Sequence, residues 1–165
     1  MAKRKFLKIP KEIDFTDEPR GPAYERLIDF ALRHCDKFSI VWREELGNEK
    51  QKNEIAVNLN PFLISNISTN KWPGTEILSG TAEVCTYKLT QETVQIIKRA
   101  KRLYQWEAPG LPEDIAFYTK DGEVWFGSVA HERMGWLNTA AIDPSELENI
   151  CEFLYNNGII NKKYF

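Results

Sequence analysis

The chain has 165 residues, of which 42% are hydrophobic. A chain of this length buries roughly two thirds of its unfolded surface around one core. We therefore expect a single domain over residues 1–165. Its net charge is −2, but five basic residues lie among the first eleven, which leaves 17 basic and 24 acidic residues in the rest. This acidic excess disfavours nucleic acid as the main partner, and the lack of an apolar run of about 18 residues or of a signal-peptide pattern predicts a cytoplasmic protein without membrane spans.

The cysteines and histidines are few and widely spaced. Cys35, Cys85 and Cys151 form neither a CxxC pair nor a complete disulfide set, which is typical of reduced thiols in the cytoplasm. Only His34 and His131 could supply imidazole, so a zinc site is not expected. The chain has no P-loop, GxGxxG, GxSxG or HExxH motif, and we therefore expect no cofactor and no metal.

The first part of the chain contains one well-marked helix and one strand. Residues 1–5 are expected to be a flexible terminus. A helix is predicted to begin near Pro22, because proline is favoured in the first turn of a helix. Apolar residues then recur at spacings of three and four, at Tyr24, Leu27, Ile28, Ala31, Leu32 and Cys35. Alternation of side chains over residues 38–43 predicts a half-buried strand.

The middle of the chain is less clearly marked. Residues 44–54 are almost wholly polar and predict a surface loop. Residues 56–68 fit either a short helix interrupted at Pro61 or irregular chain. Residues 65–80 are expected to form a loop, with a turn at Trp72, Pro73 and Gly74.

A strand and a helix are predicted next. Residues 81–89 alternate between polar and apolar, and Thr90 can cap the helix that follows. The apolar stripe of that helix is formed by Ile96, Ile97, Ala100, Leu103 and Tyr104. A basic run from Lys98 to Arg102 lies on its other side, and such a run is usually the solvated face of a helix.

Residues 111–132 predict a hairpin with a tight Asp-Gly turn at 121–122. In that register Tyr118 lies opposite Trp125, and one face of the hairpin belongs to the core. The second face is either covered by a helix or open as an aromatic surface. Its residues are Tyr118, Trp125, Val129 and His131.

The last two predicted elements complete the fold. A strand is predicted over residues 133–138, and a helix is predicted to begin at Asp143 and Pro144 and to end near Gly158. Strands and helices follow one another without a regular β-α-β rhythm. We therefore expect an α+β domain with a mainly antiparallel sheet of four to five strands and about three helices.

Several segments carry a likeness to other proteins: RGPAYERLIDFALRHCDKFSIVWRE, KWPGT, LPEDIAFY and VWFGSVAHE. Through them the chain resembles a group of small uncharacterised proteins of spore-forming, Firmicutes-type bacteria, and this resemblance implies no particular activity. Separately, a strand, a tight turn and a strand ending in His131 and Glu132 is similar to a module of some immunity proteins that neutralise polymorphic bacterial toxins. That local resemblance implies a protein partner.

Without a catalytic motif, the sequence favours a small cytoplasmic protein that binds a protein partner, either as a regulatory or as a toxin-neutralising subunit, and that is a monomer or a homodimer. Aromatic side chains beside a carboxylate are typical of protein interfaces. The candidate binding residues are Trp72, Tyr118, Trp125, His131 and Glu132. Two alternatives stay open. One is an enzyme that uses a thiol or a carboxylate, with Cys35, His34 and His131 as the candidates, and the other is nucleic-acid binding through the basic run from Lys98 to Arg102.

Overall fold

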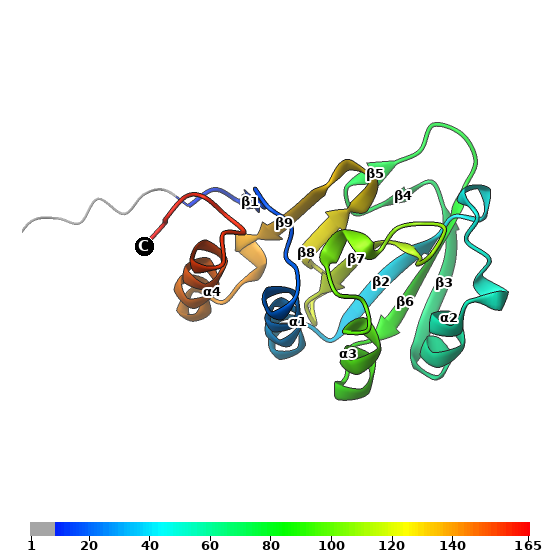
Figure 1. The fold of residues 1–165 in the computed structure, drawn as a ribbon, viewed down its shortest axis with the longest axis horizontal. Coiled ribbons are helices and arrows are strands. Elements are labelled where there is room, and N and C mark those ends of the chain that lie inside the picture. Colours follow the sequence, from blue (N-terminus) through cyan, green and yellow to red (C-terminus); the bar gives the residue numbers. More distant parts are fainter. Residues whose placement is uncertain (1–8) are drawn as a thin grey trace, which may run out of the picture.

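Seven strands form one antiparallel sheet in the computed structural model, which describes residues 9–165 (Figure 1). Across the sheet the order is β1 (Glu12–Asp14), β9 (Met134–Asn138), β8 (Val124–Val129), β7 (Glu113–Tyr118), β2 (Lys37–Trp42), β6 (Ala82–Lys88) and β3 (Leu63–Thr69). The strands β4 (Lys71–Trp72) and β5 (Thr75–Glu76) form a separate two-stranded hairpin. The expected α+β class with an antiparallel sheet is therefore confirmed.

Four α-helices lie along one side of the sheet (Figure 1). They are α1 (Pro22–His34), α2 (Glu54–Leu59), α3 (Gln91–Ile97) and α4 (Pro144–Asn156). The predicted helix signals act as expected: Thr90 accepts from the Thr93 amide at the start of α3, and the Asp143 side chain accepts from the Ser145 amide at the start of α4. Among residues 9–165, no helix combines the length and apolar character needed to span a bilayer.

The main core lies between the helices and the sheet. Alternate residues of β2, Phe38, Ile40 and Trp42, contribute to it, as do buried side chains of all four helices. The opposite face of the sheet has a much smaller cluster, made by Val41, Trp72 and Ala82, to which the β4–β5 hairpin contributes Trp72. One face of the sheet is thus fully packed, whereas the other carries a small local cover.

The hairpin of β4 and β5 reaches that second face through a glycine. Gly74 has a φ of 81°, a conformation that glycine adopts without the steric cost of a side chain. A Cβ atom at this position would lie 2.5 Å from the Trp136 ring and 2.8 Å from the Val129 side chain. The predicted turn at residues 72–74 is therefore present, and its glycine also allows the hairpin to approach β8 and β9 closely.

The sheet is larger than the sequence predicts. Segment 65–80, expected to be a loop, contains most of β3 and the β4–β5 hairpin, and four α-helices rather than about three are present. The side chains of β3 are mostly exposed, so this strand lacks the alternation that marks a half-buried strand. Segment 44–54 contains two short 3₁₀ turns before α2, and residues 1–5 lie outside the described residues.

The helix that follows Thr90 is shorter than its apolar stripe suggests. Helix α3 ends at Ile97, although the stripe continues to Tyr104. Beyond that point, backbone contacts with the segment before α1 replace the helical hydrogen bonds. The Gly21 amide donates to the Lys101 carbonyl at 2.7 Å, and Arg20 and Arg102 pair as an isolated antiparallel bridge.

The hairpin of β7 and β8 has a bulge that the sequence does not reveal. Phe117 lies opposite Phe126, as expected, but Tyr118 lies opposite Val124 rather than Trp125. Trp125 is the extra residue of the bulge, and such a residue leaves the simple alternation of faces. Trp125 consequently belongs to the main core with Phe126, so the prediction that it shares a face with Tyr118 is wrong.

Candidate functional site

Of the two alternatives for the second face of the hairpin, the open aromatic surface is not formed. Trp125 is fully buried, and its ring stacks on that of His34 in α1, with ring centroids 5.6 Å apart. Tyr118 lies on the opposite face, where its hydroxyl is 2.8 Å from the Ser39 hydroxyl. Trp72 is also buried. Trp72 and Trp125 are therefore buried in different clusters, Tyr118 is half-buried, and α1 covers Trp125.

His131 and Glu132 do lie at the surface, in the short 3₁₀ turn Ala130–Glu132 that joins β8 to β9. The Nδ1 atom of His131 is 3.6 Å from Oε1 of the buried Glu113 and 3.8 Å from Oε1 of Glu107. Trp72 contacts the same region, because its indole N–H donates a hydrogen bond to Asp114, the residue next to Glu113. The structure thus brings together Trp72 and His131, each beside one of two adjacent buried carboxyl groups.

Asp114 joins three segments of the chain. Its Oδ2 atom accepts a hydrogen bond from Trp72 Nε1 at 2.8 Å, and its Oδ1 atom accepts from the Ala130 amide at 3.1 Å. The residue has a φ of 57°, which is uncommon for a residue with a side chain but is tolerated by aspartate. Asp114 therefore links β7, the β4–β5 hairpin and the turn that carries His131.

Glu113 and Asp114 are costly to ionise in the folded protein. Burial raises the pKa of Glu113 and the neighbouring charge of Asp114 raises it further, while burial alone is the main cause of the raised pKa of Asp114. Hydrogen bonds from the backbone and from Trp72 act in the opposite direction but do not cancel this effect. The pair is a buried acidic cluster at which stability responds to pH.

We expect the free energy of unfolding to fall as the pH rises above the ordinary carboxyl pKa values of 3.8 for Asp114 and 4.5 for Glu113. In this pH range the carboxyl groups have lost their protons in the unfolded chain but keep them in the folded protein. Each retained proton therefore lowers the free energy of unfolding by up to about 1.4 kcal/mol for every unit by which the pH rises. Urea unfolding of Glu113→Gln between pH 4 and 8 should show a flatter decline. The exposed control Glu148→Gln should keep the wild-type slope, and an equal slope in all three proteins would contradict the expectation.

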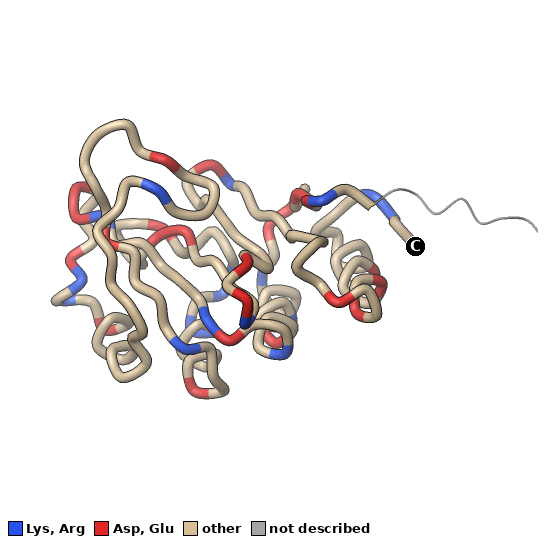
Figure 2. Tube along the Cα trace, turned by 180° about the vertical axis from the view of Figure 1, so that it is seen from behind, with Lys and Arg blue, Asp and Glu red and all other residues tan. Residues whose placement is uncertain are grey.

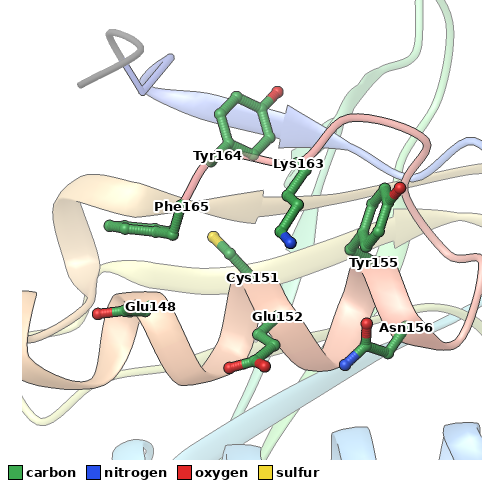
Figure 3. A pocket seen from close by; sticks show the side chains of 8 residues that line it. All are labelled: Glu148, Cys151, Glu152, Tyr155, Asn156, Lys163, Tyr164 and Phe165. Carbon is green, nitrogen blue, oxygen red and sulfur yellow. The ribbon is translucent and has the colours of Figure 1, made fainter. Parts of the chain in front are cut away.

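The three thiol groups are buried, and burial disfavours the thiolate that a Cys/His enzyme needs. Burial raises the pKa of all three cysteines, to about 11 for Cys151, so few thiolates form at neutral pH. Cys151 lines a cavity of about 230 Å³ between α4 and the C-terminal segment, beside Lys163 and Phe165 (Figure 3). Within residues 9–165, no hydrogen bond joins a cysteine to His34 or His131, so the contacts give this alternative no support.

The basic run from Lys98 to Arg102 is largely paired with acids. Lys98 lies 2.6 Å from Asp29, Arg99 lies 3.9 Å from Glu54, and Arg102 lies 3.1 Å from Glu18. Basic and acidic residues are interspersed along the described part of the chain (Figure 2). A nucleic-acid site needs a concentrated basic surface, and the run does not provide one.

The two edges of the sheet differ sharply, and this difference marks a candidate interaction surface that the sequence reasoning missed. Edge strand β1 has three residues, and its two exposed side chains are the acids Glu12 and Asp14. Edge strand β3 has seven residues, LISNIST, without a charge or a proline. Short or charged edges prevent pairing with another chain, whereas a long uncharged edge permits it. In the described residues, β3 pairs with β6 alone.

Apolar side chains on β3 are open to solvent. Leu63, Ile64 and Ile67 are 37%, 47% and 57% exposed, and Val57 of the adjacent helix α2 is 64% exposed. A groove of about 340 Å³ runs between α2 and β6 and is lined by residues that include Ala56, Val57 and Glu83. The uncharged run of seven residues is the signal available in the sequence, but with Pro61 just before it the segment is interpreted as a broken helix or irregular chain, and no strand is predicted. We call β3 with Val57 the β3 edge surface.

Neither family models, nor curated proteins, nor solved structures gave a match to this chain. The resemblances to a group of Firmicutes-type proteins and to toxin-immunity proteins therefore stay predictions. What the protein does has to follow from the geometry of its own residues.

Proposed function

We propose that this protein is a non-catalytic binding protein that takes up an extended segment of a partner protein as an additional strand beside β3. The observation that carries the proposal is the long uncharged edge of β3, with three large apolar side chains exposed on seven residues. Its register shift lies at the start of the strand, between Leu63 and Ser65, and the pairing with β6 is regular over residues 65–69. In strand addition, main-chain hydrogen bonds provide affinity and pockets for alternate side chains provide specificity. The β3 edge surface offers the backbone groups of an edge strand and exposed apolar side chains for these two kinds of contact.

The energetic argument follows from what β3 leaves unsatisfied. Each backbone hydrogen bond to a new strand contributes about 0.5–1.5 kcal/mol net, and apolar area buried on Ile64 and Ile67 adds about 25 cal/mol per Å². The β1 edge offers no such gain, because three residues can form few ladder bonds and its acids would lose water. The proposed partner therefore binds at one end of the sheet only.

The charge of the chain narrows the kind of partner. Outside the first eleven residues, acids outnumber bases by 24 to 17, and an acidic protein associates faster with a basic one. A basic toxin that the protein neutralises would be such a partner, and this is the narrower form of the proposal. Its support is the acidic excess together with the local resemblance to immunity proteins.

Introducing charge on β3 tests the proposal. We expect Ile64→Lys combined with Ile67→Lys to reduce recovery of the partner from native cells at least about tenfold, because lysine is a common means of protecting an edge strand. Both side chains are well exposed, so the free energy of unfolding should change by less than about 0.5 kcal/mol per substitution. Affinity purification with quantitative mass spectrometry measures recovery, and urea unfolding checks that the fold is intact.

A matched control separates edge binding from general surface charge. Tyr155 is 40% exposed on α4, away from β3, so Tyr155→Lys should recover the partner as the wild type does. Two results would contradict the proposal. One is wild-type protein that is recovered only as a free monomer at micromolar concentration, and the other is a partner that the β3 variant binds with undiminished yield.

A further inference from the structure

A polar cluster surrounds Glu18. It is distinct both from the acidic pair Glu113 and Asp114 and from the β3 edge surface. The Glu18 side chain is only 4% exposed and accepts hydrogen bonds from the Tyr104 amide at 2.8 Å and from Arg102 Nη1 at 3.1 and 3.3 Å. Arg20 and Arg133 lie farther away, at 3.5 and 3.8 Å. Three guanidinium groups thus surround one buried carboxylate that Tyr104 and Arg102 already satisfy at short distance.

The backbone holds these arginines in place. Arg20 and Arg102 face each other in an antiparallel bridge, and the Leu103 amide donates to the Pro19 carbonyl at 3.0 Å. Arg133 has a φ of 55°, a left-handed conformation that costs energy for a residue with a branched or long side chain. Strain of this kind persists where the surrounding structure fixes it, and it is concentrated at binding sites.

A small pocket opens beside the two outer arginines. Its volume is about 140 Å³, and it is lined by Phe15, Thr16, Asp17, Glu18, Arg20, Tyr104 and Arg133. The side chains of Arg20 and Arg133 are 64% and 66% exposed, so most of their donors are not used by Glu18. Tyr104 also lines the pocket, and its hydroxyl is protonated at neutral pH, as burial and Glu18 raise its pKa further, to about 12.

Two arginines, Arg20 and Arg133, and two acids, Asp17 and Glu18, line the pocket itself. Arg102 does not line it but binds Glu18 from behind, so the whole cluster of three arginines and two acids carries one net positive charge. Asp17 lies 3.8 Å from Arg20, and 72% of its side chain is exposed. Arginine recognises phosphate through two parallel N–H donors. We propose that the pocket formed by Arg20, Arg133 and Tyr104 around Glu18 binds a dianionic phosphate group. A pocket of this size takes a phosphate group and leaves the rest of a larger ligand outside.

Inorganic phosphate is the first probe, with sodium chloride at equal ionic strength as the reference. We expect phosphate at 20 mM to raise the melting temperature and to shift the Nε–H signals of Arg20 and Arg133 in ¹⁵N spectra, because a ligand that binds only the folded state stabilises it. Arg20→Gln and Arg133→Gln should each weaken binding about tenfold, since each removes a charge-assisted donor pair. Both side chains are exposed, so these variants should fold.

Two further variants test the electrostatic argument. Arg99→Gln removes a basic residue that does not line the pocket and should bind phosphate as the wild type does. Asp17→Asn removes the opposing acid and should tighten binding about threefold, an effect that a purely structural role of the cluster would not produce. O-phosphoserine as a second probe distinguishes the sources, since tighter binding than inorganic phosphate indicates a phosphomonoester and weaker binding indicates the free anion.

The proposal would be overturned if phosphate caused no larger effect than sodium chloride. It would equally be overturned if the combined Arg20→Gln and Arg133→Gln variant bound phosphate as tightly as the wild type. Loss of binding in Arg99→Gln to the same degree would show a response to overall charge rather than a site. None of these outcomes depends on a partner at β3.

Discussion

Replacing Asp114 by alanine is expected to lower the free energy of unfolding by about 3–5 kcal/mol. The substitution leaves the buried Trp72 indole N–H and the Ala130 amide without their acceptor, and each unpaired buried donor costs about 1–3 kcal/mol. Alanine also tolerates the left-handed backbone at φ 57° less well than aspartate does. The β4–β5 hairpin and the turn with His131 should both loosen.

A comparison with Asp114→Asn separates two contributions to the lost free energy of unfolding, namely that of the hydrogen bonds and that of the left-handed backbone at this position. Asparagine keeps one acceptor oxygen and tolerates the left-handed region, so we expect a loss of only about 1–2 kcal/mol. Urea unfolding followed by circular dichroism gives both values, and amide exchange of Lys71 to Glu76 reports on the hairpin. A loss below about 1 kcal/mol in Asp114→Ala would show that Asp114 does not hold these segments together.

The second large effect is expected at Trp125. Removing a fully buried tryptophan ring leaves a cavity between α1 and the sheet, so Trp125→Ala should lower the free energy of unfolding by about 3–5 kcal/mol. Trp125→Phe should cost about half as much. The reason is that Trp125 Nε1 is buried without a hydrogen-bond partner, and phenylalanine removes that unpaired donor while filling most of the space.

Chemical unfolding of the two variants distinguishes a covered ring from an exposed one. If Trp125 were part of an open binding surface, as the hairpin sequence alone allows, alanine would change the free energy of unfolding by less than about 0.5 kcal/mol. A small effect of that kind would contradict the position of Trp125 beneath α1. A loss of several kcal/mol would agree with its stacking on His34.

Elements with local signals were predictable from the sequence. Helix α1 begins at Pro22 as the first-turn proline predicts, and α4 begins after the Asp143 cap with Gly158 at a φ of 70° beyond its end. Phe38, Ile40 and Trp42 of β2 belong to the core on the helix side of the sheet, as the alternation predicts. These signals depend on residues within a few positions of one another, so tertiary context did not override them. The prediction of a half-buried strand is wrong, because Ser39 and Val41 on the other face of this central strand are buried as well.

The parts that were not predictable depend on contacts between distant segments. The bulge that moves Trp125 to the other face is set by the pairing of β7 with β8 rather than by either strand alone. Likewise, β3 is a strand because β6 pairs with it, although its own side chains are mostly exposed. The cluster around Glu18 joins residues 18, 102 and 133, and no short sequence pattern connects them.

The central proposal is that a partner strand adds to β3, and amide hydrogen exchange of the complex tests it most directly. The captured partner, once purified, is added to the wild-type protein, and exchange is followed at residues 63–69. We expect protection of alternate β3 amides, because in an added ladder every second residue directs its N–H toward the new strand. Unchanged exchange at β3 in a saturated complex, with protection elsewhere on the chain, would contradict the proposal.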